Sequence, residues 1–275
     1  MRYFVIISYL FLFDFCFSQT NNNIENSNKG RLYLYWGWNI DWYSKSDINF
    51  WGNDYNFTIK KAIANDKPSP FSFSTYFNPQ KATIPQYNFR IGYYFKNNWD
   101  VSFGIDHMKY VVQQNQIVKI NGYIKNSNTI FDNSYSNQNI KLTEDFLQFE
   151  HTDGLNYLNT EIRHSNKLIS IKKINISLIE GLGVGLLYPK TNAKLLGKAR
   201  HDDFHVSGYG IDGVIGVNIN FLNWFFFQSE LKGGFINMPD IRTTYYTEDK
   251  ARQNFFFSQF NFVFGGIINI KSNKK

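Results

Sequence analysis

The residues best suited to chemistry are a few histidines and carboxylates. They fall in three segments: His107, Glu150-His151-Thr152-Asp153, and His201-Asp202-Asp203 with His205. If they converge, imidazole and carboxylate groups could bind a divalent metal or act as general acid and base. Their spacings match no metal motif, so we predict no metal site and no cofactor. A solvated polar rim is the simpler interpretation, and His107, Glu150, His151 and Asp153 are the residues to test for catalysis.

A second segment, Arg163-His164-Ser165-Asn166, resembles part of the His/Ser motif of the outer-membrane lipid A deacylases. In that family the histidine is the base for a nearby serine. Here His164 and Ser165 are adjacent, so within a strand their side chains point to opposite faces. The segment also falls near a predicted periplasmic turn, away from the outer leaflet where lipid A lies. We therefore do not predict a catalytic pair here.

The elements that must position these residues are strands. In Tyr87–Phe95 every odd residue is large and apolar, whereas the even residues are mostly small, polar or charged. A period of two indicates a strand whose two faces meet different surroundings. We predict eight such strands at 31–41, 86–96, 99–112, 153–165, 172–187, 205–221, 224–236 and 255–270.

The connections between these strands alternate between long and short. This pattern is typical of an all-β, eight-stranded, antiparallel up-and-down transmembrane β-barrel with long extracellular loops and short periplasmic turns. A soluble two-sheet sandwich is the competing fold, but its connections would not sort so strictly by length.

The ends of the chain and its composition fit this location. Residues 1–18 resemble a signal peptide, 19–30 form a polar leader, 31–270 hold the barrel and 271–275 form a tail. Cys16 is the one cysteine, so a chain that loses its signal has no disulfide or thiolate site. The net charge of +7 admits nucleic acid, but there is no nucleic-acid motif and we predict no such partner. The 19% aromatic content suits interfacial girdles.

The phase of the strands also assigns residues to the barrel lumen. The charged residues on the inward face are Arg90, Asp100, Asp106, Glu161, Arg163, Asp212, Glu230 and Lys232. Because eight strands leave room only for side chains, we expect a structural ion-pair network. A narrow ion or proton path and a catalytic carboxylate are the alternatives. Strict alternation would place Glu180 on the lipid face, so we expect a local bulge there.

The first long loop is rich in aromatic residues: Trp51, Tyr55, Phe57, Phe71, Phe73, Tyr76 and Phe77. These side chains could form a contact surface for sugar or protein. They could equally pack the loop into a compact cap, which is the interpretation we favour.

Several segments resemble an outer-membrane β-barrel family of Bacteroidetes-type bacteria, related in kind to the small OmpA/OmpX-like barrels. They are Phe17-Ser18-Gln19, Gly37-Trp38-Asn39, Ser46-Asp47-Ile48-Asn49-Phe50 and Phe149-Glu150-His151-Thr152-Asp153-Gly154. The family has no assigned activity, so the resemblance implies location and fold only. The chain departs from many such barrels at its end, because Lys271–Lys275 replaces the usual aromatic signal and the nearest candidates are Phe262 and Phe264.

The sequence thus predicts a protein of the Gram-negative cell outer membrane that contacts lipid and lipopolysaccharide. The first hypothesis is a non-enzymatic protein whose loops, 42–85 and 113–152, bind an extracellular ligand or reinforce the envelope. The second is a hydrolase or acyltransferase that modifies lipid A, and the third is a small pore. An enzyme requires convergent polar groups beside a lipid-sized groove, and a pore requires an open lumen.

Overall fold

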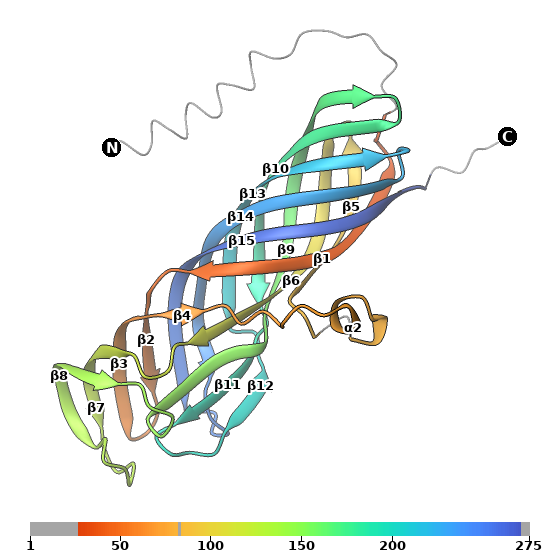
Figure 1. The fold of residues 1–275 in the computed structure, drawn as a ribbon. Coiled ribbons are helices and arrows are strands. Elements are labelled where there is room, and N and C mark those ends of the chain that lie inside the picture. Colours follow the sequence, from red (N-terminus) through yellow and green to blue (C-terminus); the bar gives the residue numbers. More distant parts are fainter. Residues whose placement is uncertain (1–26, 82–83, 271–275) are drawn as a thin grey trace.

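The structure, a computed structural model, describes residues 27–81 and 84–270. Eight strands form a closed antiparallel ring (Figure 1): β1 (Arg31–Tyr43), β5 (Tyr87–Lys96), β6 (Trp99–Val112), β9 (Leu147–Ile171), β10 (Ile174–Leu187), β13 (Gly208–Phe221), β14 (Phe225–Arg242) and β15 (Lys250–Asn269). Each pairs with the next in chain order, and β15 pairs with β1 to close the ring. The predicted up-and-down barrel is therefore confirmed. The predicted signal peptide, the leader as far as residue 26 and the tail lie outside the described residues.

Three ring strands extend at least five residues beyond the ranges that the sequence predicted. β15 begins at Lys250 rather than 255. β9 spans 147–171 rather than 153–165, and β14 reaches Arg242 rather than 236. The cause in β9 is a bulge, because Met108 pairs with Leu155 while Tyr110 pairs with His151. Gly154 lies in this bulge with φ 122°, a conformation that a side chain would disfavour. The alternation breaks there although the strand continues.

Short and long connections lie at opposite ends of the ring, as predicted (Figure 1). The short turns are residues 97–98, 172–173 and 222–224. Each contains a residue with a left-handed backbone, which tight hairpin turns favour: Asn98 (φ 63°), Lys172 (φ 54°) and Asn223 (φ 63°). The first residue of β1, Arg31, pairs with Asn269 at this same end.

The long connections are largely folded rather than loose loops. They contain β2 (Ser46–Trp51), β3 (Tyr55–Ala62), β4 (Ala64–Asn65), β7 (Ile117–Ile124), β8 (Asn133–Lys141), β11 (Lys190–Leu195) and β12 (His201–Phe204). β15 pairs with β2 where it extends beyond β1, and the sheet continues through β3 and β7 to β8. β11 pairs with the outer end of β9 and with β12. We call these strands, with the outer ends of β6, β9, β14 and β15, the outer lobe.

The outer lobe has an apolar core of its own. Its largest fully buried side chains are aromatic, among them Phe50, Phe57, Phe146 and Phe149. Phe50 stacks on Phe57 with ring centroids 5.4 Å apart and meets Phe149 edge-on at 5.4 Å. Each buried aromatic ring stabilises the folded lobe by roughly 1.5–3 kcal/mol. The lobe is therefore a packed unit that continues the barrel wall.

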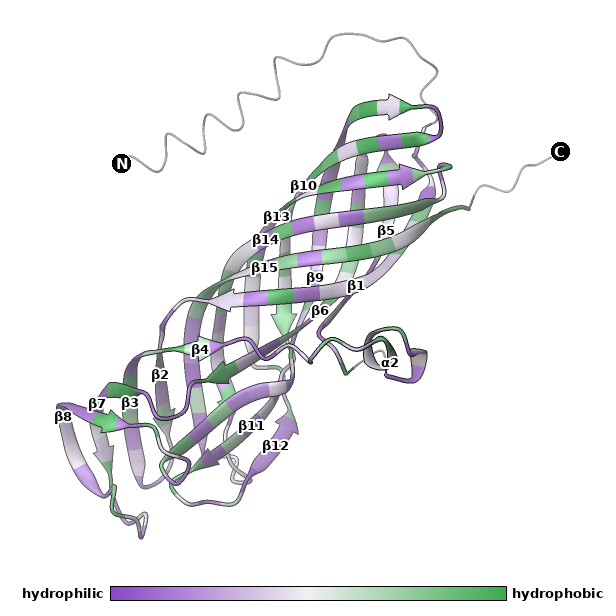
Figure 2. Cartoon of the chain, in the orientation of Figure 1, coloured by the Kyte–Doolittle hydropathy of each residue, from purple (hydrophilic) through white to green (hydrophobic). Residues whose placement is uncertain are grey.

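The outside of the ring is apolar. Hydrophilic and hydrophobic residues alternate along the ring strands in Figure 2, and the outward apolar side chains are well exposed, for example Leu182 (71%), Val184 (62%) and Leu231 (59%). A closed ring pairs its backbone groups internally and presents an apolar exterior to lipid, which is the construction of an outer-membrane barrel. Among the residues described, no helix is long and apolar enough to cross a membrane.

The connection between β4 and β5 differs from the other long connections. It carries two short helices, α2 (Phe73–Tyr76) and η1 (Pro79–Lys81). In Figure 1 α2 stands beside the barrel rather than within the outer lobe.

Candidate functional site

Glu161 on β9 makes more ion pairs than any other described carboxylate of the lumen. Its Oε1 lies 2.5 Å from Arg90 Nη2 and 2.8 Å from Lys232 Nζ, and its Oε2 lies 2.5 Å from Arg163 Nε. All four side chains are at most 2% exposed. They come from β5, β9 and β14, whose inward faces meet because the ring closes. One carboxylate thus neutralises parts of three buried cations.

Two further carboxylates complete the ion pairs. Arg163 Nη1 lies 2.6 Å from Glu230 Oε1, and Lys232 Nζ lies 2.5 Å from Asp106 Oδ2. Glu230 and Asp106 are each about 1% exposed. A buried charge is tolerated when it is paired and hydrogen-bonded in this way.

The remaining two predicted lumen residues, Asp100 and Asp212, are held by tyrosines instead of cations. Tyr33 donates its hydroxyl to Asp100 at 2.8 Å, and Tyr157 donates to Asp212 at 2.7 Å. The hydroxyl of Tyr35 accepts bonds from Arg90 Nε (3.0 Å) and Arg163 Nη2 (3.2 Å). Sequence reasoning missed these tyrosines because it selected only charged residues, although Tyr33 and Tyr35 occupy the inward phase of their strand.

All eight charged residues assigned to the lumen from phase are buried inside the ring, at 5% exposure or less. The interior is therefore filled by side chains that bond to one another. Arg90 alone contacts Tyr35, Ser102, Asn159 and Glu161. Such a packed interior holds the strands together and leaves little room for a solute.

The rim histidine His107 belongs to a local contact rather than to a cluster. Its Nδ1 lies 2.8 Å from Asn156 Oδ1, and its ring stacks on Tyr87 with centroids 4.9 Å apart. It is only 7% exposed. These contacts position the imidazole against the wall of β5 and β9.

His151 lies inside the outer lobe. It is fully buried between the rings of Tyr110 (5.8 Å) and Phe149 (5.1 Å), and neither ring nitrogen has a hydrogen-bond partner. Burial lowers the pKa of His151 to about 3, so the imidazole is neutral at ordinary pH. A base so enclosed cannot reach a substrate.

The two rim carboxylates have separate partners. Glu150 accepts bonds from Asn192 Nδ2 (2.9 Å) and Thr152 Oγ1 (3.1 Å), whereas Asp153 lies 3.6 Å from Lys190 Nζ. Within the described ranges, no hydrogen bond or ion pair joins any two members of the predicted rim set: His107, Glu150, His151 and Asp153. The fold does not assemble them into a reaction centre.

The third histidine segment is also dispersed. His205 Nε2 lies 3.1 Å from Asp240 Oδ2, whereas His201 packs edge-on against Tyr245 at 6.1 Å. Over residues 27–81 and 84–270, no group of three or more His, Cys, Asp or Glu side chains could hold a metal ion.

The predicted bulge at Glu180 is wrong. Glu180 pairs in regular register with Ile215 on one side and His164 on the other, and the nearest register shift lies between Ile176 and Ser177. Its carboxylate faces outward, 3.1 Å from His164 Nδ1, and His164 packs on Trp99 at 4.7 Å. Trp99 directly follows a short turn, so this pair lies at the periplasmic border of the belt, where polar and aromatic groups meet water. Ser165 is 8% exposed and points to the opposite face from His164, as the spacing predicted.

Five of the seven aromatic residues of the first connection fall into two sets, whereas Trp51 and Tyr76 are half-buried. Tyr55 and Phe57 pack into the core of the outer lobe, as the cap interpretation predicted. Phe71, Phe73 and Phe77 do not, because they are 66%, 74% and 57% exposed.

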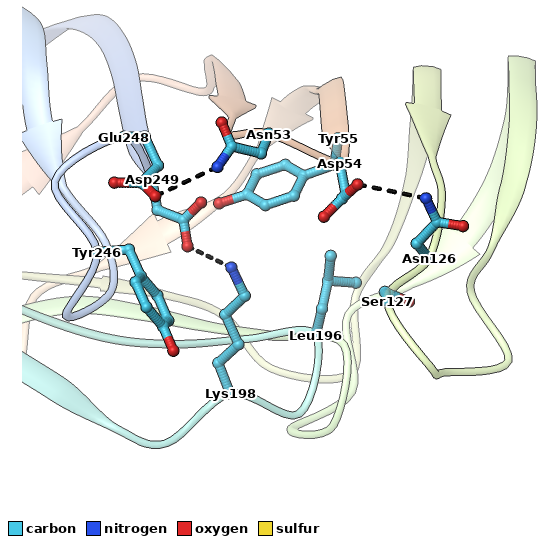
Figure 3. A pocket seen from close by; sticks show the side chains of 10 residues that line it. All are labelled: Asn53, Asp54, Tyr55, Asn126, Ser127, Leu196, Lys198, Tyr246, Glu248 and Asp249. Carbon is cyan, nitrogen blue, oxygen red and sulfur yellow. Dashed lines mark hydrogen bonds and ion pairs between the residues drawn. The ribbon is translucent and has the colours of Figure 1, made fainter.

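A pocket of about 270 Å³ opens at the tip of the outer lobe (Figure 3). Its lining comes from four connections far apart in the sequence: Asn53, Asp54, Tyr55, Asn126, Ser127, Leu196, Lys198, Tyr246, Glu248 and Asp249. Sequence reasoning missed it because no single segment carries a motif.

Lys198 is the central charged group of this tip pocket. It donates to Asp249 and lies over the rings of Tyr55 (5.2 Å) and Tyr246 (5.4 Å). Figure 3 shows the Lys198 ammonium joined to the Asp249 carboxylate, with the rings of Tyr55 and Tyr246 beside them. Burial and the Asp249 carboxylate raise the pKa of Tyr55, so its phenol stays protonated. The site combines two tyrosine rings with fixed polar groups.

No protein-family model matches the chain, and no curated protein matches it in sequence. Among solved structures it is similar to the outer membrane protein OprG of Pseudomonas aeruginosa, with 11% identity, a TM-score of 0.40, and coverage of 90% of this chain and 100% of that one. It is also similar to Neisserial surface protein A (7%, TM-score 0.31, 84% and 98%) and to the attachment invasion locus protein Ail of Yersinia pestis (9%, TM-score 0.27, 85% and 99%). At these scores the outer-membrane location rests on the closed ring and the apolar exterior.

Proposed function

We propose that this protein is a non-enzymatic outer-membrane barrel whose outer lobe binds an extracellular ligand. The observation that carries the proposal is the outer lobe itself. It continues the barrel wall through β15 and β2 and is packed around buried aromatic rings such as Phe50 and Phe149. A packed lobe presents its surface groups in fixed positions, and this lowers the entropy lost on binding.

The tip pocket is the proposed point of contact. It places Tyr246, which is 58% exposed, beside amide, carboxylate and ammonium groups. Planar polar side chains bond to hydroxyl groups, while a tyrosine ring offers an apolar platform of fixed geometry. The pocket lining contains three carboxylates, Asp54, Glu248 and Asp249, and one ammonium group, Lys198, so it disfavours anionic ligands. A neutral or amino-substituted oligosaccharide fits this chemistry best.

Two features support this function over catalysis and transport. The rim residues of the enzyme hypothesis, such as His107 and His151, have separate surroundings. The lumen of the pore hypothesis is filled by the ion pairs of Glu161. The membership of a Bacteroidetes-type family, the Gram-negative source and the signal peptide are part of the same proposal and rest on the sequence motifs.

The test is binding of the detergent-solubilised full-length protein to a printed array of neutral and amino oligosaccharides. Tyr246→Ala removes the exposed ring of the tip pocket and should weaken binding by at least about tenfold, as expected for an aromatic anchor. Tyr245→Ala is the matched control, because Tyr245 is adjacent and 84% exposed but does not line the pocket. Absence of binding to every oligosaccharide, or equal losses in both variants, would refute the proposal.

A further inference from the structure

Four aromatic residues around α2 form a cluster outside the barrel. Phe71 packs against Phe73 (5.4 Å) and Tyr76 (5.2 Å), and Phe73 stacks on Phe77 (5.7 Å). We call Phe71, Phe73, Tyr76 and Phe77 the aromatic anchor. Three of its rings are more than half exposed, which is costly for apolar groups in water.

The aromatic anchor rests on the outer face of β1. Trp38 points outward from that strand and meets Tyr76 at 5.6 Å and Phe77 at 5.3 Å. Trp38 also packs on Phe264 of the neighbouring strand, at 5.9 Å. The anchor is therefore continuous with the apolar belt of the barrel.

The contact between Trp38 and the aromatic anchor lies within the apolar exterior of the barrel. Further along β1 toward the outer lobe, Ile40 and Trp42 still present exposed apolar side chains (48% and 55%). On β15, Phe256 is 64% exposed and precedes Phe257, which pairs with Tyr43 at the outer end of β1. The anchor thus lies at a level where apolar side chains still cover the outside of the wall, and Figure 1 shows α2 beside the barrel.

Several polar groups of the anchor segment are bonded locally, whereas the indole N–H of Trp38 beneath it has no hydrogen-bond partner within the described residues. The backbone N–H groups of Tyr76 and Phe77 donate to Ser72 O (3.0 Å) and Phe73 O (3.0 Å). The Ser72 hydroxyl donates to Thr75 Oγ1 at 2.8 Å, and the Tyr76 hydroxyl donates to the carbonyl of Ser69 at 2.6 Å. Each polar group that is paired in this way lowers the cost of bringing the segment into contact with lipid, where an unpaired group is expensive.

From these observations we propose that the aromatic anchor inserts into the outer leaflet and is covered by lipid acyl chains. The occupant is lipid because the cluster extends a surface that already faces lipid. Exposed lysines flank it in the sequence: the Lys67 side chain is 64% exposed, with its Nζ 3.9 Å from Glu150 Oε2, and Lys81 is exposed as well. Long cationic side chains at this border reach up to the phosphate groups of lipids. The anchor fixes the connection between β4 and β5 to the membrane, independently of any ligand at the tip pocket.

The test measures the depth of a spin label in vesicles of dimyristoyl phosphatidylcholine. A nitroxide is attached at Phe73→Cys in a Cys16→Ser background, so that the introduced cysteine is unique. Leu182→Cys on the belt (71% exposed) and Ile130→Cys on the outer lobe (91% exposed) are the lipid and water controls. The readout is the collision rate with oxygen, which concentrates in lipid, relative to that with a water-soluble nickel chelate.

We expect the oxygen-to-nickel ratio at residue 73 to match that at residue 182 and to exceed the ratio at residue 130 severalfold. A ratio equal to that at residue 130 would overturn the proposal, because the anchor would then lie in water. Low collision rates with both reagents would also overturn it, since a protein surface or a second copy would then cover the site. Phe71→Cys provides a second label, and an unheated electrophoresis shift checks that each variant is folded.

Discussion

Replacing Glu161 with glutamine tests whether the lumen network stabilises the barrel. Glu161→Gln keeps the shape of the side chain but removes the negative charge. The carboxylate of Glu161 is the one ion-pair partner of Arg90 among the described residues, whereas Arg163 and Lys232 keep Glu230 and Asp106. The substitution therefore leaves Arg90, which is 0% exposed, as a buried cation held only by neutral groups.

Breaking a buried ion pair by removing one partner costs about 3–5 kcal/mol, because the other charge stays desolvated. We expect Glu161→Gln to lower the free energy of unfolding by that amount. The assay is urea unfolding in detergent micelles, followed by tryptophan fluorescence. Glu180→Gln is the control, because Glu180 also lies in the β9–β10 hairpin but its side chain is 38% exposed. We expect a change of at most about 1 kcal/mol in that variant.

A double variant sharpens the test. Adding Arg90→Gln to Glu161→Gln removes the orphaned cation, so the double variant should be more stable than Glu161→Gln alone. Equal unfolding midpoints for wild type and Glu161→Gln would show that the network contributes no stability. A double variant that is weaker by the sum of both single losses would show that Arg90 and Glu161 act independently.

Three further predictions concern other parts of the molecule. The pKa of His151 is about 3 in the folded state and about 6.5 in the unfolded state, so the unfolded state binds the proton first as the pH falls. The wild-type protein should therefore lose roughly 2 kcal/mol of its free energy of unfolding between pH 7 and pH 5. Urea titrations at pH 7 and pH 5 should show that His151→Phe abolishes this His151-dependent loss of stability. Equal losses of stability in the wild type and in the variant would contradict the prediction. Phe149→Ala should destabilise the outer lobe by about 3–5 kcal/mol and speed its cleavage by trypsin in vesicles, while the exposed Phe73→Ala should not. Gly104→Ala places a Cβ 2.6 Å from Arg90 Nη2, so the substitution should displace the guanidinium and lower the urea midpoint of unfolding. Gly213→Ala is the control, because its Cβ meets nothing nearer than 3.6 Å. Equal urea midpoints for the two variants would exclude a tightly packed lumen.

Local alternation in the sequence was sufficient to find the ring. A strand exposes alternate side chains to opposite faces, so the phase of Tyr87–Phe95 alone separates lipid-facing from inward residues. For this reason all eight charged residues assigned to the lumen, from Arg90 to Lys232, lie inside it. The spacing of the strands likewise predicted which connections are short.

The structure of the long connections was beyond the reach of that reasoning. β2 pairs with β15 across about two hundred residues, and β3 pairs with β7. Such pairings depend on where the ring closes and on how far β9 and β15 extend beyond it. A bulge at Gly154 hid the outer part of β9, and the tip pocket draws on four connections with no shared motif.

The sequence by itself determined the faces of the strands, and with them the membrane location and the polar character of the lumen. Only the tertiary structure decided the partners. It made Glu161 the centre of three ion pairs, buried His151 among aromatic rings, paired Glu180 with His164 and left the aromatic anchor outside the wall. The physical reason is that side-chain direction is a local property of a strand, whereas the register between strands is set by closure of the whole ring.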